Sequence, residues 1–168
     1  GAIPEQEPAV TEPAVGPGEL RHIIGYKRAT ELEEKKVEWI VPNQIPRGML
    51  TCLAGEQGVG KGGRISHLSA RASVGEPLLP GSEGCDPMGV MIFSSEDSWD
   101  RVWLPRFLAA GGDPQRLYFH EGVPGRGNAE PRPLEIPNDA AWLEQEIHAT
   151  GVGLVVFDPI LEFLAENV

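Results

Sequence analysis

A glycine-rich segment at residues 54–63, AGEQGVGKGG, has the residue types and spacing of a loop that binds phosphate. In such a loop, backbone N–H groups point at the phosphate, and the N-terminus of the following helix adds partial positive charge. The glycines allow a tight turn, and Lys61 would reach the β and γ oxygens. The predicted nucleotide-binding residues are Gly55, Glu56, Gln57, Gly58, Val59, Gly60, Lys61, Gly62 and Gly63.

The pattern is broken at Gly62, where a Ser or Thr hydroxyl would reach Mg²⁺. Gly63 also lacks a hydroxyl, and Ser66 lies about one helical turn further along. Mg²⁺ would then be held by phosphate oxygens, water and acids from other strands. Two glycines in the first turn of a helix cost about 1 kcal/mol each relative to Ala, which indicates close packing against a ligand or relaxed selection.

Two acids follow apolar runs on the side where the phosphates would lie. Glu96 follows the run at 89–93, and Asp158 follows the run at 154–157. We predict that Asp158 organises Mg²⁺ and that Glu96 is the general base toward the water that attacks the γ-phosphate, with Lys61 as the third catalytic residue. In the alternative interpretation, Glu96 or Asp97 caps the next helix and Asp158 begins a turn with Pro159.

Short apolar runs alternate with helical patterns, which predicts an α/β fold with a mainly parallel sheet and flanking helices. Ligands of such sheets bind at the carboxyl ends of the strands. The predicted strands are 49–54, 89–93, 117–119 and 154–157, the last expected in the centre of the sheet because it has no polar alternation. Four helices are predicted. A short one lies at 28–36, and one with Ile65, Leu68 and Ala72 on one face ends before Gly75. Another lies at 99–110 and is kinked or split by Pro105, and the last lies between an Asn138 N-cap and a Gly151 C-cap, with Trp142, Leu143 and Ile147 on its apolar side.

Composition narrows the class of protein. The 168 residues are 40% hydrophobic and 23% charged, as in one globular domain, and no run of about 18 apolar residues could span a membrane. There is no signal-peptide pattern, so we predict a cytoplasmic protein with no membrane partner, in which Cys52 is a buried packing residue. The net charge of −11 argues against nucleic-acid binding by bulk electrostatics. Residues 1–19 are rich in Pro and Glu and are predicted to be a disordered tail.

Four segments together resemble a known family. VEWIVPNQIPRGMLTCLAGEQGVGKG, GVMIFSSED, LPRFLAAGGDPQRL and GLVVFDPI resemble the RecA-like ATPase domain of the RepA type, found in replicative helicases and related ATPases of plasmids, phages and mobile elements. The resemblance covers residues 29–164. It implies a RecA-like P-loop AAA ATPase that binds ATP and Mg²⁺ at a subunit interface, assembles as a hexameric ring and takes part in DNA replication. By motif match, residues 55–61 are the phosphate loop, Glu96 is the water-activating glutamate and Asp158 is the aspartate of the second motif.

The sequence departs from this family in two ways. Gly62 replaces the Ser or Thr of the family pattern, which affects metal affinity and hydrolysis more than binding, because adenylate kinases also carry Gly after this lysine. The sequence also stops soon after the Asp158 strand, so residues 20–168 are expected to be the N-terminal part of a RecA-like domain whose later strands, with the DNA-contacting loops, are missing. Two alternatives stay open: a catalytically silent remnant or interaction protein, and a nucleotide kinase, which the scattered arginines disfavour.

Overall fold

The computed structural model describes residues 28–120, 122–125 and 130–165, so the tail predicted at 1–19 lies outside the described residues. The chain divides into two units, Gly1–Val37 and Glu38–Val168. In the first unit, the helix predicted at 28–36 is wrong: only a 3₁₀ turn, η1 (Ala29–Glu31), forms there. Residues 28–36 are all exposed, and so short a helix is not stable in water without an apolar face packed against the protein.

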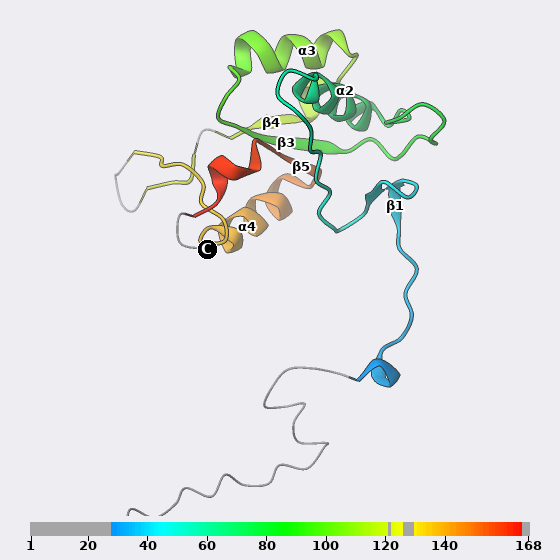
Figure 1. The fold of residues 1–168 in the computed structure, drawn as a ribbon. Helices are drawn as coiled ribbons and strands as arrows, with labels where there is room; N and C mark the ends of the chain where they lie inside the picture. Colours follow the sequence, from blue (N-terminus) through cyan, green and yellow to red (C-terminus); the bar gives the residue numbers. More distant parts are fainter. Residues whose placement is uncertain (1–27, 121, 126–129, 166–168) are drawn as a thin grey trace, which may run out of the picture. The chain divides into compact units, whose positions relative to one another are not determined.

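A parallel three-stranded sheet forms the centre of the second unit. Its strands are β3 (Gly89–Ser94), β4 (Leu117–Phe119) and β5 (Val152–Asp158), in the order β4-β3-β5. The helices α2 (Lys61–Val74) and α3 (Leu104–Ala109) cover one face of the sheet, and α4 (Ala140–Thr150) covers the other (Figure 1). The predicted α/β fold with a parallel sheet and flanking helices is therefore confirmed.

The core follows from the burial of β3 on both faces. Val90 and Ile92 pack with Ala72 of α2 and Trp103, whereas Met91 and Phe93 pack against the face that α4 covers. A strand covered on both sides needs apolar residues at consecutive positions, as the sequence GVMIF has. β3 is the central strand of the described sheet, and it holds the two helical layers together.

The helix α2 follows the predicted pattern. It begins at Lys61 and ends at Val74, and Gly75 takes the left-handed conformation, with φ 76°, that terminates it. Ala72 is buried, and Ile65 and Leu68 pack partly against the same cluster. The predicted apolar face of this helix is thereby confirmed.

The helical segment after β3 is split, as the sequence predicts from Pro105. A π-helical turn, η2 (Trp99–Trp103), leads directly into α3, with Pro105 in the first turn of α3. A proline is tolerated there because the first N–H groups of a helix have no partner within it. Trp103 and Phe107 are fully buried and attach both pieces to the core.

The start of α4 differs by one residue from the prediction. Asp139, not Asn138, is the N-cap, and its side chain does not cap the helix. The carboxylate instead accepts hydrogen bonds from the Arg132 guanidinium and from the Glu135 backbone N–H at 2.8 Å. Gly151, with φ 67°, ends the helix as predicted. The predicted apolar side is also confirmed, because Trp142, Leu143 and Ile147 pack against the core.

The strands predicted at 117–119 and 154–157 are confirmed as β4 and β5, but the strand predicted at 49–54 and the central position predicted for 154–157 are wrong. Residues 49–54 form no strand and are exposed, including Cys52, and β5 lies at an edge of the described sheet rather than at its centre. An apolar run becomes a buried strand only when a neighbouring strand satisfies its backbone, and residues 49–54 pair with none. A small antiparallel hairpin of β1 (Trp39–Val41) and β2 (Ile45–Pro46) precedes them, and Ile40 and Val41 are buried in the core.

In the part of the chain that the structure describes, no helix is long and apolar enough to cross a membrane.

The Arg132–Asp139 ion pair predicts a pH-dependent contribution to stability. The hydrogen bond that Asp139 accepts from Arg132 holds the pKa of Asp139 below the ordinary value of 3.8. The stabilisation is therefore present above about pH 4 and is lost as the pH falls through the lower folded-state pKa. At pH 7, Asp139→Asn should lower the free energy of unfolding by about 1 to 2 kcal/mol, a modest value because Arg132 is half exposed.

Urea denaturation at several pH values would measure this difference, which should shrink below pH 4. Glu144→Gln is the matched control, because it removes one charge from an exposed site on the same helix. Equal losses for the two variants at pH 7 would contradict the prediction.

Candidate functional site

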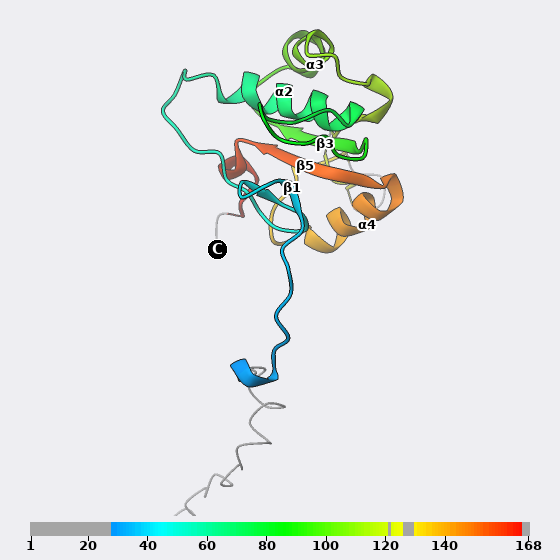
Figure 2. The same cartoon turned by 90° about the vertical axis from the view of Figure 1, so that its right-hand side faces the viewer.

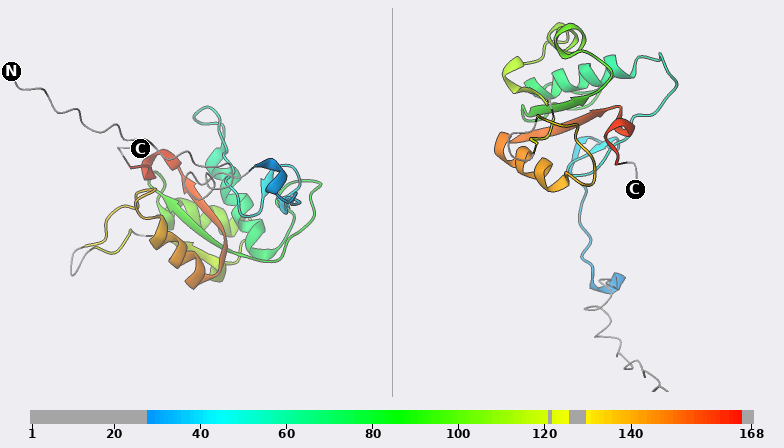
Figure 3. Two further views of the ribbon diagram at one scale, coloured as in Figure 1. Left: turned by 90° about the horizontal axis from the view of Figure 1, so that it is seen from below. Right: turned by 90° about the vertical axis from the view of Figure 1, so that its left-hand side faces the viewer.

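The predicted phosphate loop lies in an exposed turn at the start of α2. Residues 55–60 are exposed, and the chain reaches them through an arm at 49–54 that stands away from the sheet (Figures 2 and 3). Gly58 and Gly60 have φ values of 82° and 88°, which residues with a side chain rarely adopt. No atom lies within 4 Å of a Cβ built at either glycine, so a ligand has room to approach this backbone.

Lys61 is the first residue of α2, and its side chain folds back over the loop. Its Nζ donates hydrogen bonds to the carbonyl oxygens of Gly55 and Glu56, each at 2.8 Å. The ammonium group thus joins the two ends of the loop. An anion bound in the loop would meet this charge together with the N–H groups of the first turn of α2.

The carboxyl ends of β3 and β5 lie beside this first turn. Ser94 pairs with Asp158 in the sheet register, and the Ser95 N–H donates to the Asp158 carbonyl oxygen at 3.3 Å. A Cβ built on Gly62 would lie 3.7 Å from Oδ2 of Asp158 and 3.8 Å from Oδ2 of Asp97. The structure therefore brings the phosphate loop and Asp158 together, as expected for ligand binding at the carboxyl ends of parallel strands.

Burial raises the pKa of Asp158 above the ordinary value, and the negative charges of Glu96 and Asp97 raise it further. The charges of Lys61 and Arg106 act in the opposite direction. An ionised Asp158 carboxylate is thus held close to two other acids. A cation bound beside Asp158 would relieve this repulsion.

Glu96 lies two residues beyond the end of β3 and is exposed. Neither Glu96 nor Asp97 caps the following helix, because Ser98 occupies the N-cap position of η2. The alternative turn at Asp158 is present in part: Pro159 precedes a short 3₁₀ helix, η4 (Ile160–Phe163). This turn leaves the Asp158 side chain at the first turn of α2, so the structural and functional interpretations of Asp158 are compatible.

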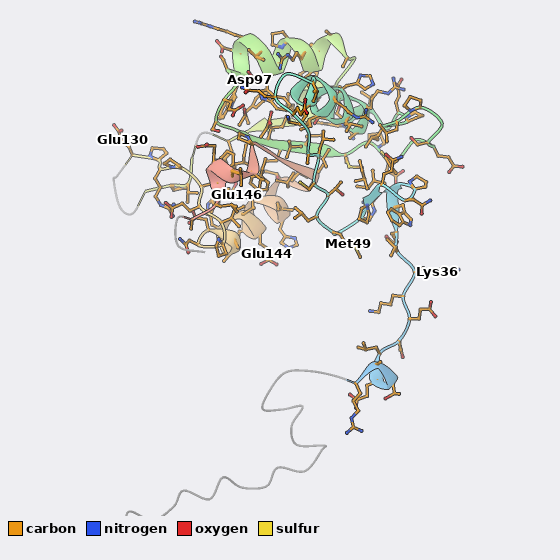
Figure 4. The ribbon with its side chains drawn as sticks, in the orientation of Figure 1. Lys36, Met49, Asp97, Glu130, Glu144 and Glu146 are labelled. Carbon is orange, nitrogen blue, oxygen red and sulfur yellow. The ribbon has the colours of Figure 1, made fainter. Side chains whose placement is uncertain are left out.

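The structure adds one pair that sequence reasoning missed. Arg106 of α3 donates from Nη1 to Oδ2 of Asp97 at 2.9 Å, and the same Nη1 lies 3.6 Å from a Cβ built on Gly62. Asp97 lies beside α2 and α3, the two helices that cover one face of the sheet (Figure 4). The sequence held only a weak signal for the pair, an acid and an arginine nine residues apart with the split helix between them.

The residues of the phosphate loop and Asp158 fit a nucleotide phosphate well and Mg²⁺ only in part. The left-handed glycines, the Lys61 ammonium and the helix N-terminus provide donors for phosphate oxygens. Mg²⁺ usually uses one or two carboxylates together with phosphate oxygens and water, and Asp158 is one such carboxylate. Gly62 provides no ligand. Among the described side chains, no group of three or more His, Cys, Asp or Glu could hold a metal ion by itself.

The positive φ of Gly60 predicts that a side chain at this position strains the backbone. Gly60→Ala should lower the free energy of unfolding by about 1 to 2 kcal/mol, the range for an L-residue held at positive φ. If the loop changes shape instead, its N–H groups lose their alignment and ATP binding weakens. Urea denaturation and calorimetric titration with ATP would measure the two effects.

Gly63→Ala is the matched control, because Gly63 lies in α2 with open space around it and no positive φ. This substitution should leave stability equal or higher by up to about 1 kcal/mol. A Gly60→Ala protein with wild-type stability and wild-type ATP binding would contradict the prediction.

The chain matches a known protein family over most of its length. Residues 27–168 match the family model of the AAA domain, which is most of the chain. Neither the curated proteins nor the solved structures contain a match to this chain. The family match and the phosphate loop at the carboxyl edge of a parallel sheet agree, and the chain belongs to the AAA domain family of P-loop ATPases.

Proposed function

We propose that this chain is the ATP-binding module of a RecA-like ATPase related to the RepA-type replicative helicases of plasmids and phages. One observation carries the proposal: Gly62, in the first turn after the phosphate loop, lies against Asp158 at the end of β5. A phosphate held by the loop would therefore have a carboxylate at its side. The four sequence segments that resemble RepA-type domains support the finer assignment.

Each proposed site residue has a distinct task. The backbone N–H groups of residues 55–63 and the Lys61 ammonium bind the β and γ phosphates. Mg²⁺, when it is bound with the nucleotide, neutralises phosphate charge and polarises the bond that breaks. Asp158 would hold the metal, and Glu96 would accept a proton from the water that attacks the γ-phosphate. Glu96 is exposed, so water reaches it directly.

Assembly and DNA binding belong to the same proposal. In the RepA type, the nucleotide lies between subunits of a hexameric ring, and DNA contacts come from parts of the domain beyond the strand that carries Asp158. We propose that this chain oligomerises in the same way and that DNA is a partner of the assembly. We also propose that it acts in the cytoplasm.

A second candidate function is a catalytically silent interaction protein. The glycine at position 62 and the unpaired residues at 49–54 favour it, because both weaken the usual nucleotide site. Measurement of ATP turnover distinguishes the proposed ATPase from the silent interaction protein. The proposed ATPase should lose turnover in Glu96→Gln while it keeps ATP binding, because the amide cannot accept the proton.

Measured hydrolysis that Glu96→Gln abolishes would rule out the silent protein. If the wild type binds ATP but shows no turnover above a Glu96→Gln preparation, the silent protein is favoured. Transfer of phosphate to a nucleoside monophosphate would instead indicate a kinase.

Calorimetric titration with ATP and Mg²⁺ tests the binding proposal. Lys61→Ala should weaken ATP binding about 10- to 100-fold, which corresponds to the loss of charge-assisted hydrogen bonds to phosphate. Lys36→Ala is the control, because Lys36 is an exposed lysine of the first unit. The proposal fails if the wild type binds no ATP at millimolar concentration, or if Lys61→Ala and Lys36→Ala bind it equally.

A further inference from the structure

We propose that Arg106 is a built-in cation of the phosphate site, which compensates for the missing hydroxyl at Gly62 and lets the chain bind ATP with little dependence on Mg²⁺. This inference rests on the proposed function, because it concerns how the same site neutralises a bound phosphate. It differs from the family pattern, in which a Ser or Thr after the lysine holds the metal.

The Arg106 guanidinium lies at the position where the hydroxyl and its metal would be expected. Around a Cβ built on Gly62, the three nearest atoms are Nη1 of Arg106 at 3.6 Å, Oδ2 of Asp158 at 3.7 Å and Oδ2 of Asp97 at 3.8 Å. Gly62 follows Lys61 directly, so a phosphate bound by the loop would lie close to the guanidinium. A cation is thus already present beside the two carboxylates at the residue that follows Lys61.

Arg106 is anchored in this position by the residues around it. Pro105 lies in the first turn of α3, and Phe107, the next residue, is fully buried in the core. Asp97 then fixes the guanidinium through the 2.9 Å hydrogen bond. A guanidinium has five N–H donors, so this bond leaves donors for phosphate oxygens. The Arg106 side chain is 48% exposed, so a ligand can reach it.

The charges explain why such a cation matters. The site gathers the carboxylates of Glu96, Asp97 and Asp158 against the cations of Lys61 and Arg106. The ion pair with Arg106 neutralises Asp97, which would otherwise repel a phosphate. Without Arg106, Lys61 alone would face these acids and a polyanionic ligand, and Mg²⁺ would become necessary.

Isothermal titration of the full chain with ATP, once with Mg²⁺ and once with EDTA, tests the inference. The wild-type dissociation constant should differ by less than about threefold between the two conditions, under 1 kcal/mol of binding energy. Arg106→Ala should weaken binding by at least about tenfold in EDTA, as expected for a lost charged hydrogen bond, and Mg²⁺ should restore most of it.

Arg116→Ala is the matched control. Arg116 forms an ion pair with Asp113 at 3.3 Å, and the side chains of this pair are about as exposed as those of Arg106 and Asp97. Arg116 lies just before β4 begins, which is the end of the sheet opposite to the phosphate site. This variant changes the net charge equally and should bind ATP as the wild type does in both conditions. Thermal unfolding of both variants would show that each is folded.

Gly62→Ser is the reciprocal variant. A Cβ at this position meets only ordinary van der Waals distances, so the serine fits, and its hydroxyl comes within reach of Asp158 and Arg106. Mg²⁺ should therefore strengthen ATP binding by a larger factor in Gly62→Ser than in the wild type. An unchanged Mg²⁺ effect would overturn the link to Gly62.

Other outcomes separate this inference from the proposed function. The inference would be overturned if the wild type binds ATP only with Mg²⁺ and if Arg106→Ala and Arg116→Ala bind ATP with equal affinity. The proposed function would then still stand. An equal loss in Arg106→Ala with and without Mg²⁺ would also overturn the inference, because Arg106 would then be an ordinary phosphate ligand. A wild type that binds no ATP in either condition would overturn the proposed function itself.

Discussion

The parallel pairing of β3 with β5 is the interaction on which the rest of the structure depends. Its register places Ser94 opposite Asp158, so the segment that follows β3 and the last residue of β5 reach the same edge of the sheet. The burial of both faces of β3 fixes this register, because a slip of one residue would exchange the residues of its two faces. The site thus inherits its geometry from the packing of the core.

The proposed phosphate site is rich in carboxylates, although its ligand is an anion. The chain as a whole carries a net charge of −11, so no long-range attraction brings a nucleotide to it. In the function proposed here, binding comes from short-range donors: the N–H groups of the loop, Lys61 and the Arg106 guanidinium. Burial is the main cause of the raised pKa of Asp158, and the negative charges of Glu96 and Asp97 add to it. A site of this kind discriminates by contact geometry rather than by charge at a distance.

The elements that the sequence predicts correctly are those whose pattern is local. The run at 89–93 needed only its own apolar residues to indicate β3, and the spacing of Ile65, Leu68 and Ala72 indicated α2. Residues 49–54 have an equally apolar composition, but strand formation depends on a partner that the composition does not specify. Arg106 was missed for a related reason: its contact with Asp97 joins α3 to the segment that precedes η2, and only the folded chain shows that pairing.

The exposed arm at residues 49–54 has a consequence for the thermodynamics of ligand binding. Its apolar side chains are in contact with water, and Leu50 is 86% exposed. The arm leads directly into the phosphate loop. Apolar surface that leaves water lowers the heat capacity, and the size of this change follows the buried area. The enthalpy of nucleotide binding would then fall steeply with rising temperature if the arm closes on the protein, and stay nearly constant if it remains in solvent.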